Sequence, residues 1–401
     1  MTQAIDAFRP ARPSYVRVVG GVGAAHFVSH YYILLLAPLM PFVRQEYGVS
    51  YTEIGLAFAA FNIVSAVLQT PAGFLVDWLG ARLLLIAGLI VGAAAFAVVG
   101  LTHSFWLLVA MFGLAGIGNT VYHPADYALL SQHVPNERIG QAFSVHTFAG
   151  MLGSAVTPPA VLAMQALWGW RGAMIGSAAL GLAAAVLLIA MRESETARPI
   201  ARKKDGGAAD WQVLMSAPVL LNLLFFVLLA MISGGLYNYS VVAFGALYGT
   251  PVATANAALT GNLLLTAIGV LAGGLLVGRT RRHGLVASIG LATAAAFTLL
   301  FAEIDLGTVA LIAAMSAAGF FSGVIMPSRD MIVRAVTPAG SFGKVFGFVT
   351  TGFNIGGIVA PLIFGAIMDH GSPRLVFLTV AALTLAAIAT VATRPRRAAA
   401  D

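Results

Sequence analysis

Charged residues and cysteine are scarce in this 401-residue chain. Only 9% of its residues are charged and 59% are hydrophobic, with a mean hydropathy of +0.91, whereas an average soluble domain is about 25% charged. This composition predicts an integral membrane protein surrounded by a lipid bilayer. The absence of cysteine excludes disulfides and thiolate metal sites.

Signatures of common enzyme classes are also missing. The sequence contains no His-Glu-x-x-His helix, no Gly-x-Ser-x-Gly turn and no phosphate-binding loop. We therefore expect no enzyme activity and no cofactor, and an ATP-driven pump is excluded. A membrane enzyme or receptor is the alternative from a different class, but no motif supports it. Solute movement would have to draw on a gradient such as that of protons.

Apolar runs long enough to cross a bilayer recur along the chain, and one crossing needs about 20 helical residues. The sequence thus predicts an all-α membrane protein with twelve transmembrane helices in two pseudo-symmetric six-helix bundles. The predicted spans are 18–43, 51–77, 83–102, 105–132, 139–166, 171–191, 216–246, 252–278, 285–302, 308–335, 342–368 and 374–393. The predicted parts are a cytoplasmic tail (1–17), a first bundle (18–191), a cytoplasmic linker (192–215), a second bundle (216–393) and a second tail (394–401).

The two halves share a register, as duplicated halves of a transporter do. Shifted by 203 positions, Pro124 falls on Pro327 and Pro158 on Pro361. This internal repeat predicts that the fourth and tenth spans form facing walls of one central pathway.

Basic residues are distributed unevenly between the predicted loops. Most of the 22 Lys and Arg residues lie in the tails and in alternate loops; Arg44, Arg171 and Arg374 lie in the opposite loops, and Arg329 and Arg334 lie inside a span. Because cytoplasmic loops carry excess positive charge, both termini are predicted to be cytoplasmic, in a cytoplasmic (inner) membrane of bacterial type. The net charge of +7 therefore reports orientation, and no nucleic-acid partner is expected.

Two ionisable residues follow the uncharged run Phe105–Thr120 in the fourth span. Asp126 and His123 are three residues apart, hence on one helix face, and Pro124 between them removes a backbone hydrogen bond. Ionisable groups inside a membrane are costly and mark functional sites. We expect this pair to bind and release protons; the alternative is a structural salt bridge from Asp126 to Arg329.

Polar side chains in other spans suggest a substrate site. His26 and His30, four residues apart in the first span, share a face that should look inward. In the seventh span Tyr237 and Asn238 form an uncharged polar patch suited to orienting a substrate. His146, isolated in the fifth span, is a further residue that could face the pathway.

The tenth span concentrates charge in Arg329, Asp330 and Arg334. An arginine keeps its charge when buried and binds carboxylate or phosphate through two parallel hydrogen bonds. If Asp330 neutralises one arginine, the other remains available. We therefore predict that Arg329 and Asp330 belong to a binding site for an anionic substrate.

The end of the second span resembles a family signature. Gly73, Leu75, Asp77, Gly80 and Arg82 match the loop motif between spans two and three of the major facilitator superfamily. The resemblance implies twelve-helix transporters that work by alternating access, with one pathway per chain and hence a monomer. It also implies that Asp77 is a gate residue and that Arg82 is its partner.

A narrower resemblance is to fosmidomycin-resistance-type exporters. It rests on His26-Phe27, Pro38 with Pro41, Gly55, Gly73 with Asp77, and Gly118 with His123-Pro124. This resemblance implies that a small phosphonate or related organic anion leaves in exchange for protons. Two alternatives remain open: proton symport that brings in an organic acid, and transport of a divalent metal. The metal ligands would be His26, His30, His123 and Asp126.

Overall fold

The computed structural model describes residues 15–135, 138–191, 212–338 and 342–392. Within these ranges the chain forms helices joined by short turns, without β-strands. Residues 15–17 of the predicted first tail are helical. The rest of that tail, residues 192–211 of the predicted linker and the predicted tail 394–401 lie outside the described residues.

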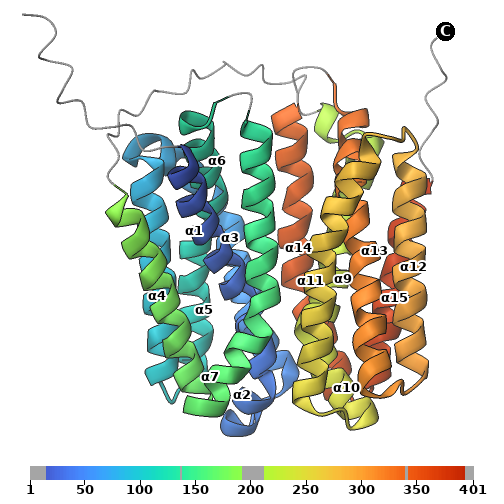
Figure 1. Ribbon diagram of the computed structural model, residues 1–401. Coiled ribbons are helices and arrows are strands. Elements are labelled where there is room, and N and C mark those ends of the chain that lie inside the picture. Colours follow the sequence, from blue (N-terminus) through green and yellow to red (C-terminus); the bar gives the residue numbers. More distant parts are fainter. Residues whose placement is uncertain (1–14, 136–137, 192–211, 339–341, 393–401) are drawn as a thin grey trace, which may run out of the picture.

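Two helical bundles stand side by side (Figure 1). The first contains α1 (Tyr15–Leu34), η2 (Ala37–Leu39), α2 (Met40–Tyr47), α3 (Tyr51–Leu79), α4 (Ala81–Leu101), α5 (Phe105–Asn119), α6 (Tyr122–His133) and α7 (Ile139–Ala190). The second contains α9 (Ala217–Gly234), η3 (Gly235–Tyr239), α10 (Ser240–Tyr248), α11 (Val252–Val277), α12 (His283–Glu303), α13 (Gly307–Val336), α14 (Phe342–Asp369) and α15 (Pro373–Ala392).

The helix count agrees with the predicted all-α membrane fold. Eleven helical stretches of the described residues are long and apolar enough to cross a membrane. One of them, α7, has 52 residues and would be about 78 Å long if straight, whereas the hydrocarbon core measures about 30 Å. It turns at Gly169, whose φ is 68°, and therefore supplies two crossings. The total is twelve.

Several crossings are interrupted within their length. The fourth is split between α5 and α6, with Pro124 in the first turn of α6; because proline has no N–H, it cannot bond the carbonyl four residues earlier. The seventh contains the π-helical turn η3 between α9 and α10. π-Helical turns often occur at functional sites. Both interruptions coincide with polar residues.

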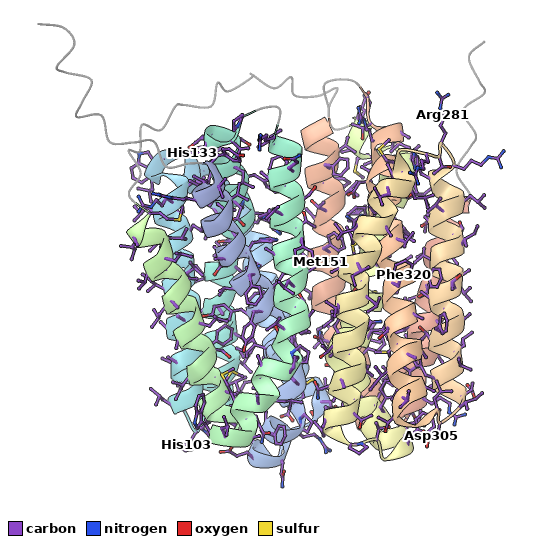
Figure 2. All side chains as sticks on the ribbon, in the orientation of Figure 1. His103, His133, Met151, Arg281, Asp305 and Phe320 are labelled. Atoms are coloured by element: carbon purple, nitrogen blue, oxygen red, sulfur yellow. The ribbon has the colours of Figure 1, made fainter. Side chains whose placement is uncertain are left out.

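The two ends of the bundles are named by residues that lie at them. We call the end where α1 begins the Tyr15 side, and the end where α3 begins and α14 ends the Asp369 side. Figure 2 shows His133 and Arg281 on the Tyr15 side, and His103 and Asp305 on the Asp369 side. Met151 of α7 lies between the bundles at mid-depth in that view.

Between the bundles, α3 packs on α14 and α7 packs on α11. The first pair is tightly apposed towards the Asp369 side. A Cβ added to Gly55 would lie 2.8 Å from the carbonyl oxygen of Pro361, and one added to Gly365 would lie 2.7 Å from Cα of Thr52. At greater depth Asn354 donates a hydrogen bond to Gln69 (3.3 Å). Glycine thus allows the two bundles to touch through their backbones.

Candidate functional site

A group of ionisable side chains lies inside the first bundle, where α1, α6 and α7 meet. We call His26 and His30 of α1, His123 and Asp126 of α6, and His146 of α7 the histidine cluster. Helical spacings of three and four residues place each pair on one face of its helix. The three helices therefore bring together groups that are far apart in the sequence.

Asp126 is the centre of the cluster, and its side chain is 0% exposed. Its Oδ2 shares a hydrogen bond of 2.9 Å with Nε2 of His146 and lies 3.1 Å from Nδ1 of His26. The rings of His26 and His146 stack with their centroids 3.6 Å apart. The carboxylate is thus held by histidines of two neighbouring helices rather than by His123 of its own helix.

The other two histidines extend the cluster in different directions. The ring of His30 lies 4.8 Å from that of His26, and its Nδ1 is 3.3 Å from the hydroxyl of Ser154. The ring of His123 lies 5.2 Å from that of His26 and stacks on Tyr127 at 6.0 Å. Unlike His26 and His146, His123 is exposed. It is the exposed edge of an otherwise buried group.

Some buried polar atoms of the cluster have no hydrogen-bond partner among the described residues. They are Oδ1 of Asp126 and Nδ1 of His146, and Nδ1 of His26 faces Asp126 outside hydrogen-bond geometry. Such atoms are uncommon in folded proteins and call for an explanation. A carboxylate oxygen and imidazole nitrogens with free lone pairs can take up a proton or a cation.

Gly150 of α7 leaves the space that two of the rings occupy. A Cβ at this position would lie 2.6 Å from Cδ2 of His26 and 2.9 Å from Cδ2 of His30. The neighbouring Gly153 lets α7 approach the backbone of α1 at Phe27. Small residues on α7 therefore set the distance between α1 and α7, and with it the stacking of the rings.

A divalent metal ion is one ligand that the cluster could hold. One nitrogen each from His26, His123 and His146 lies within 4.8 Å of the others. This group differs from the predicted metal ligands, because His146 takes the place of His30 and the Asp126 carboxylate contacts the histidines from one side.

Arg329 does not pair with Asp126. Its Nε donates to Asp330 at 2.9 Å, and its guanidinium lies 4.9 Å from the ring centre of Phe226 and 5.5 Å from that of Phe353. The alternative of a salt bridge from Asp126 to Arg329 is therefore wrong for this conformation. The Arg329 guanidinium is therefore bound by the neighbouring residue Asp330 and flanked by two phenylalanine rings.

The predicted polar patch of the seventh crossing falls on η3. Tyr237 and Asn238 are half-buried there, and Tyr237 approaches Ser233 and Thr266. No hydrogen bond, ion pair or ring contact found among the described residues joins them to the histidine cluster. The substrate residues predicted from sequence are thus divided between two bundles.

The predicted gate residues lie apart from one another. Asp77 is exposed and lines a cleft of about 440 Å³ between α3 and α6, together with Tyr127 and Ser131. Arg82 instead donates hydrogen bonds to the carbonyls of Leu188 (2.8 Å) and Ile189 (3.0 Å) at the end of α7. The predicted pairing of Asp77 with Arg82 is therefore not formed in this structure.

Comparison with known proteins identifies the architecture. The family model described as Major Facilitator Superfamily matches residues 22–252 and 223–401. The fold is similar to that of a crystal structure of a mutant nucleoside transporter NupG, with a TM-score of 0.79 and 13% identity over 94% of this chain and 99% of that one.

Two curated relatives are similar in sequence. The fosmidomycin resistance protein of Escherichia coli is 24% identical over 95% of this chain and 93% of its own length. The probable L-galactonate transporter of the same species is 31% identical, but the match covers only 36% of this chain and 32% of that protein. The chain belongs to the Major Facilitator Superfamily and is a membrane transporter of small solutes, not an enzyme.

Proposed function

We propose that this transporter is proton-coupled and exports a small organic anion or drug across a bacterial-type inner membrane by alternating access. The observation that carries the proposal is the buried carboxylate of Asp126, which contacts His146 and His26 and has no arginine or lysine partner among the described residues. An ionised carboxylate in such surroundings is costly. Binding a proton relieves that cost, and His123 offers a route from the solvent.

Closure of the Asp369 side supports alternating access. The contacts between α3 and α14 extend from Asp369 to Gln69 and Asn354. Towards the Tyr15 side the exposed Asp77, Tyr127 and His123 follow instead. This arrangement is expected when a pathway is closed at one end, and it makes Asp77 a candidate for the gate that closes at the other end.

The distribution of paired charges favours a cytoplasmic Tyr15 side. On the Asp369 side Arg171 is paired with Glu46, and Arg374 with Glu303 at 2.9 Å. On the Tyr15 side the exposed Arg281 (Figure 2) has no ion pair within the described residues. Uncompensated positive charge is typical of cytoplasmic loops.

Arg329, together with Asp330, is the proposed contact for an anionic solute, and Tyr237, Asn238, His26 and His30 are proposed to orient it. Fosmidomycin is a phosphonate and L-galactonate is a sugar acid, so the names of both relatives fit an anion. A second candidate is uptake of an organic acid by proton symport, and the name of the L-galactonate relative fits the organic acid as its solute.

Transport in proteoliposomes tests this proposal and separates the two directions. Purified full-length protein is reconstituted, and fosmidomycin or L-galactonate movement is followed under an imposed pH gradient. Movement of the solute against the proton flow is expected for export, and movement with the proton flow would establish symport. Transport that ignores the pH gradient would refute proton coupling.

Arg329→Gln is expected to raise the KM for either anion about tenfold or more, because hydrogen bonds to a charged group contribute about 1.5–3 kcal/mol. Arg281→Gln, which removes an exposed charge far from the bundle interface (Figure 2), should leave KM unchanged. Initial rates at increasing anion concentration measure the difference. An unchanged KM in Arg329→Gln would remove this guanidinium from the substrate site.

Gly150→Ala is expected to lower the transport rate several-fold while leaving the protein folded, because the new Cβ displaces the rings of His26 and His30. Gly140→Ala on the same helix is the matched control, since nothing lies within 4 Å of its Cβ position. Rates are compared at equal amounts of protein with the same melting temperature. Equal rates would mean that the stacking of the rings does not matter for transport.

A further inference from the structure

The geometry points to a binding site for a divalent transition-metal ion of the Zn²⁺ type in the histidine cluster, formed by His26, His123 and His146 with Asp126 beside them, and we infer that the bound ion blocks transport. That the ion binds is independent of the proposed function. That it blocks transport rests on the proposed role of Asp126 in proton coupling.

The donor atoms are of the kind that these ions prefer. Imidazole nitrogen suits Zn²⁺ and neighbouring first-row ions, whereas Mg²⁺ and Ca²⁺ prefer sets of oxygen ligands. The chain contains no cysteine, so thiolate sites do not compete within it. Zn²⁺ is therefore the probe and Mg²⁺ the control ion.

The spacing is close to what a bound ion requires. Nitrogens bound to one tetrahedral Zn²⁺ at about 2.0–2.1 Å lie about 3.4 Å from each other. One nitrogen from each of the three histidines already lies within 4.8 Å of the others. Side-chain rotations that move the nitrogens by about an ångström would bring them to the spacing that the ion requires. The exposed side chain of His123 can make part of this movement.

The charge of the site favours a cation. The Asp126 carboxylate is the acidic group within salt-bridge distance of these histidines in the described residues, and Arg329 is held by Asp330 instead. With neutral imidazoles and an ionised Asp126 carboxylate, the cluster carries a net negative charge. A carboxylate next to metal-binding histidines also orients their rings and makes them more basic.

Unpartnered buried atoms give independent support. Oδ1 of Asp126 and Nδ1 of His146 belong to side chains 0% and 2% exposed, and neither atom has a hydrogen-bond partner in the described part of the chain. A cation bound to either atom would supply the missing partner. Because metal binding uses imidazole lone pairs, it competes with protons.

The ion has a path from the Tyr15 side. His123 is exposed, its ring stacks on Tyr127, and Tyr127 lines the cleft that also contains the carboxylate of Asp77. An exposed carboxylate at the entrance raises the local concentration of a divalent cation.

Calorimetric titration of Zn²⁺ into the purified full-length protein in detergent tests binding, with a purification tag that contains no histidine. We expect one saturable site for Zn²⁺ and none for Mg²⁺. His146→Gln and His123→Gln should each weaken binding by at least about 10- to 100-fold, the range found when metal-supporting groups are lost. His103→Gln, on the exposed Asp369 side (Figure 2), is the matched control and should bind like the wild type. Absence of a saturable site, or equal affinity in all variants at equal melting temperature, overturns the inference.

A second measurement separates the blocking role from the proposed function. In proteoliposomes, Zn²⁺ should inhibit fosmidomycin or L-galactonate transport, and radioactive Zn²⁺ should not accumulate. Zinc accumulation driven by the pH gradient would overturn the blocking role and make the ion the cargo. Zinc binding in a protein whose anion transport ignores pH would leave the binding site intact and refute only the proposed proton coupling.

Discussion

Asp126→Asn is expected to abolish proton-coupled transport and leave the solute flux under a pH gradient at the level of protein-free vesicles. The substitution keeps the size of the side chain and its hydrogen-bonding capacity towards His146, and it leaves the contact with His26 in place. It removes the ability to alternate between a charged and a neutral form. The substituted amide would hold the helices together but could not carry a proton.

The measurement needs a readout that does not depend on coupling. Exchange of labelled fosmidomycin or L-galactonate across vesicles without a pH gradient reports alternating access alone, and it should persist in Asp126→Asn. The control is Asp305→Asn, an exposed acid on the Asp369 side whose one hydrogen bond within the described residues is accepted from the backbone N–H of Gly307 in its own turn. If gradient-driven transport by Asp126→Asn matched that of the control, Asp126 would not be the coupling group.

Burial is what distinguishes Asp126 from the other acids near the bundle interface. Asp77 is exposed, and Asp330 is bonded to Arg329 with nearly half of its side chain, 48%, accessible. Both carboxylates are accessible, so their ionised forms cost less than that of a buried acid, and gaining a proton changes less in their surroundings. Protonation of Asp126 changes the charge of a group in contact with two other helices, which couples proton binding to their packing.

The sequence predicts the helical architecture because bilayer thickness imposes a length on each crossing. It also predicts that Asp126 matters, because an acid inside an apolar span is costly wherever its helix faces. The sequence does not predict which side chains contact the Asp126 carboxylate. His146 is a lone histidine in the sequence, and only the relative rotation of α6 and α7 brings its ring to Asp126.

The internal sequence repeat likewise does not predict which side chains contact each other. It aligns Arg329 with Asp126 by a shift of 203 positions, and a shared register says that two residues occupy related places in their own bundles. It does not say that their side chains touch. Asp330, one residue away, reaches the guanidinium first, and the rings of Phe226 and Phe353 fix its position.

Asp369→Ala is expected to shift the equilibrium between the two access states towards opening of the Asp369 side by about two- to thirty-fold. The Asp369 carboxylate of α14 accepts hydrogen bonds from the backbone N–H groups of Tyr51 (2.7 Å) and Thr52 (2.8 Å) and from the Thr52 hydroxyl (2.6 Å). These donors begin α3, so the contact joins the two bundles.

The position of Asp369 on its own helix favours its contact with the start of α3. A carboxylate at the C-terminal end of a helix is repelled by the partial negative charge there, whereas the N-terminal end of α3 attracts it. Removing a carboxylate that bonds the first N–H groups of a helix typically costs about 0.5–2 kcal/mol. Since the contact is exposed, added salt should weaken it in the wild type and have less effect in Asp369→Ala.

Double electron–electron resonance, which measures the distance between two spin labels, tests this prediction. The chain has no cysteine, so labels attach only at introduced sites, and His103→Cys and Asp305→Cys place them on opposite bundles of the Asp369 side (Figure 2). Asp369→Ala should enrich the longer distances, and Asp369→Asn, which keeps one acceptor, should do so less. Glu303→Gln is the matched control, because it breaks an exposed ion pair with Arg374 inside one bundle. Identical distributions in Asp369→Ala and Glu303→Gln would mean that the close packing of Gly55 and Gly365 holds this side closed without help from the carboxylate.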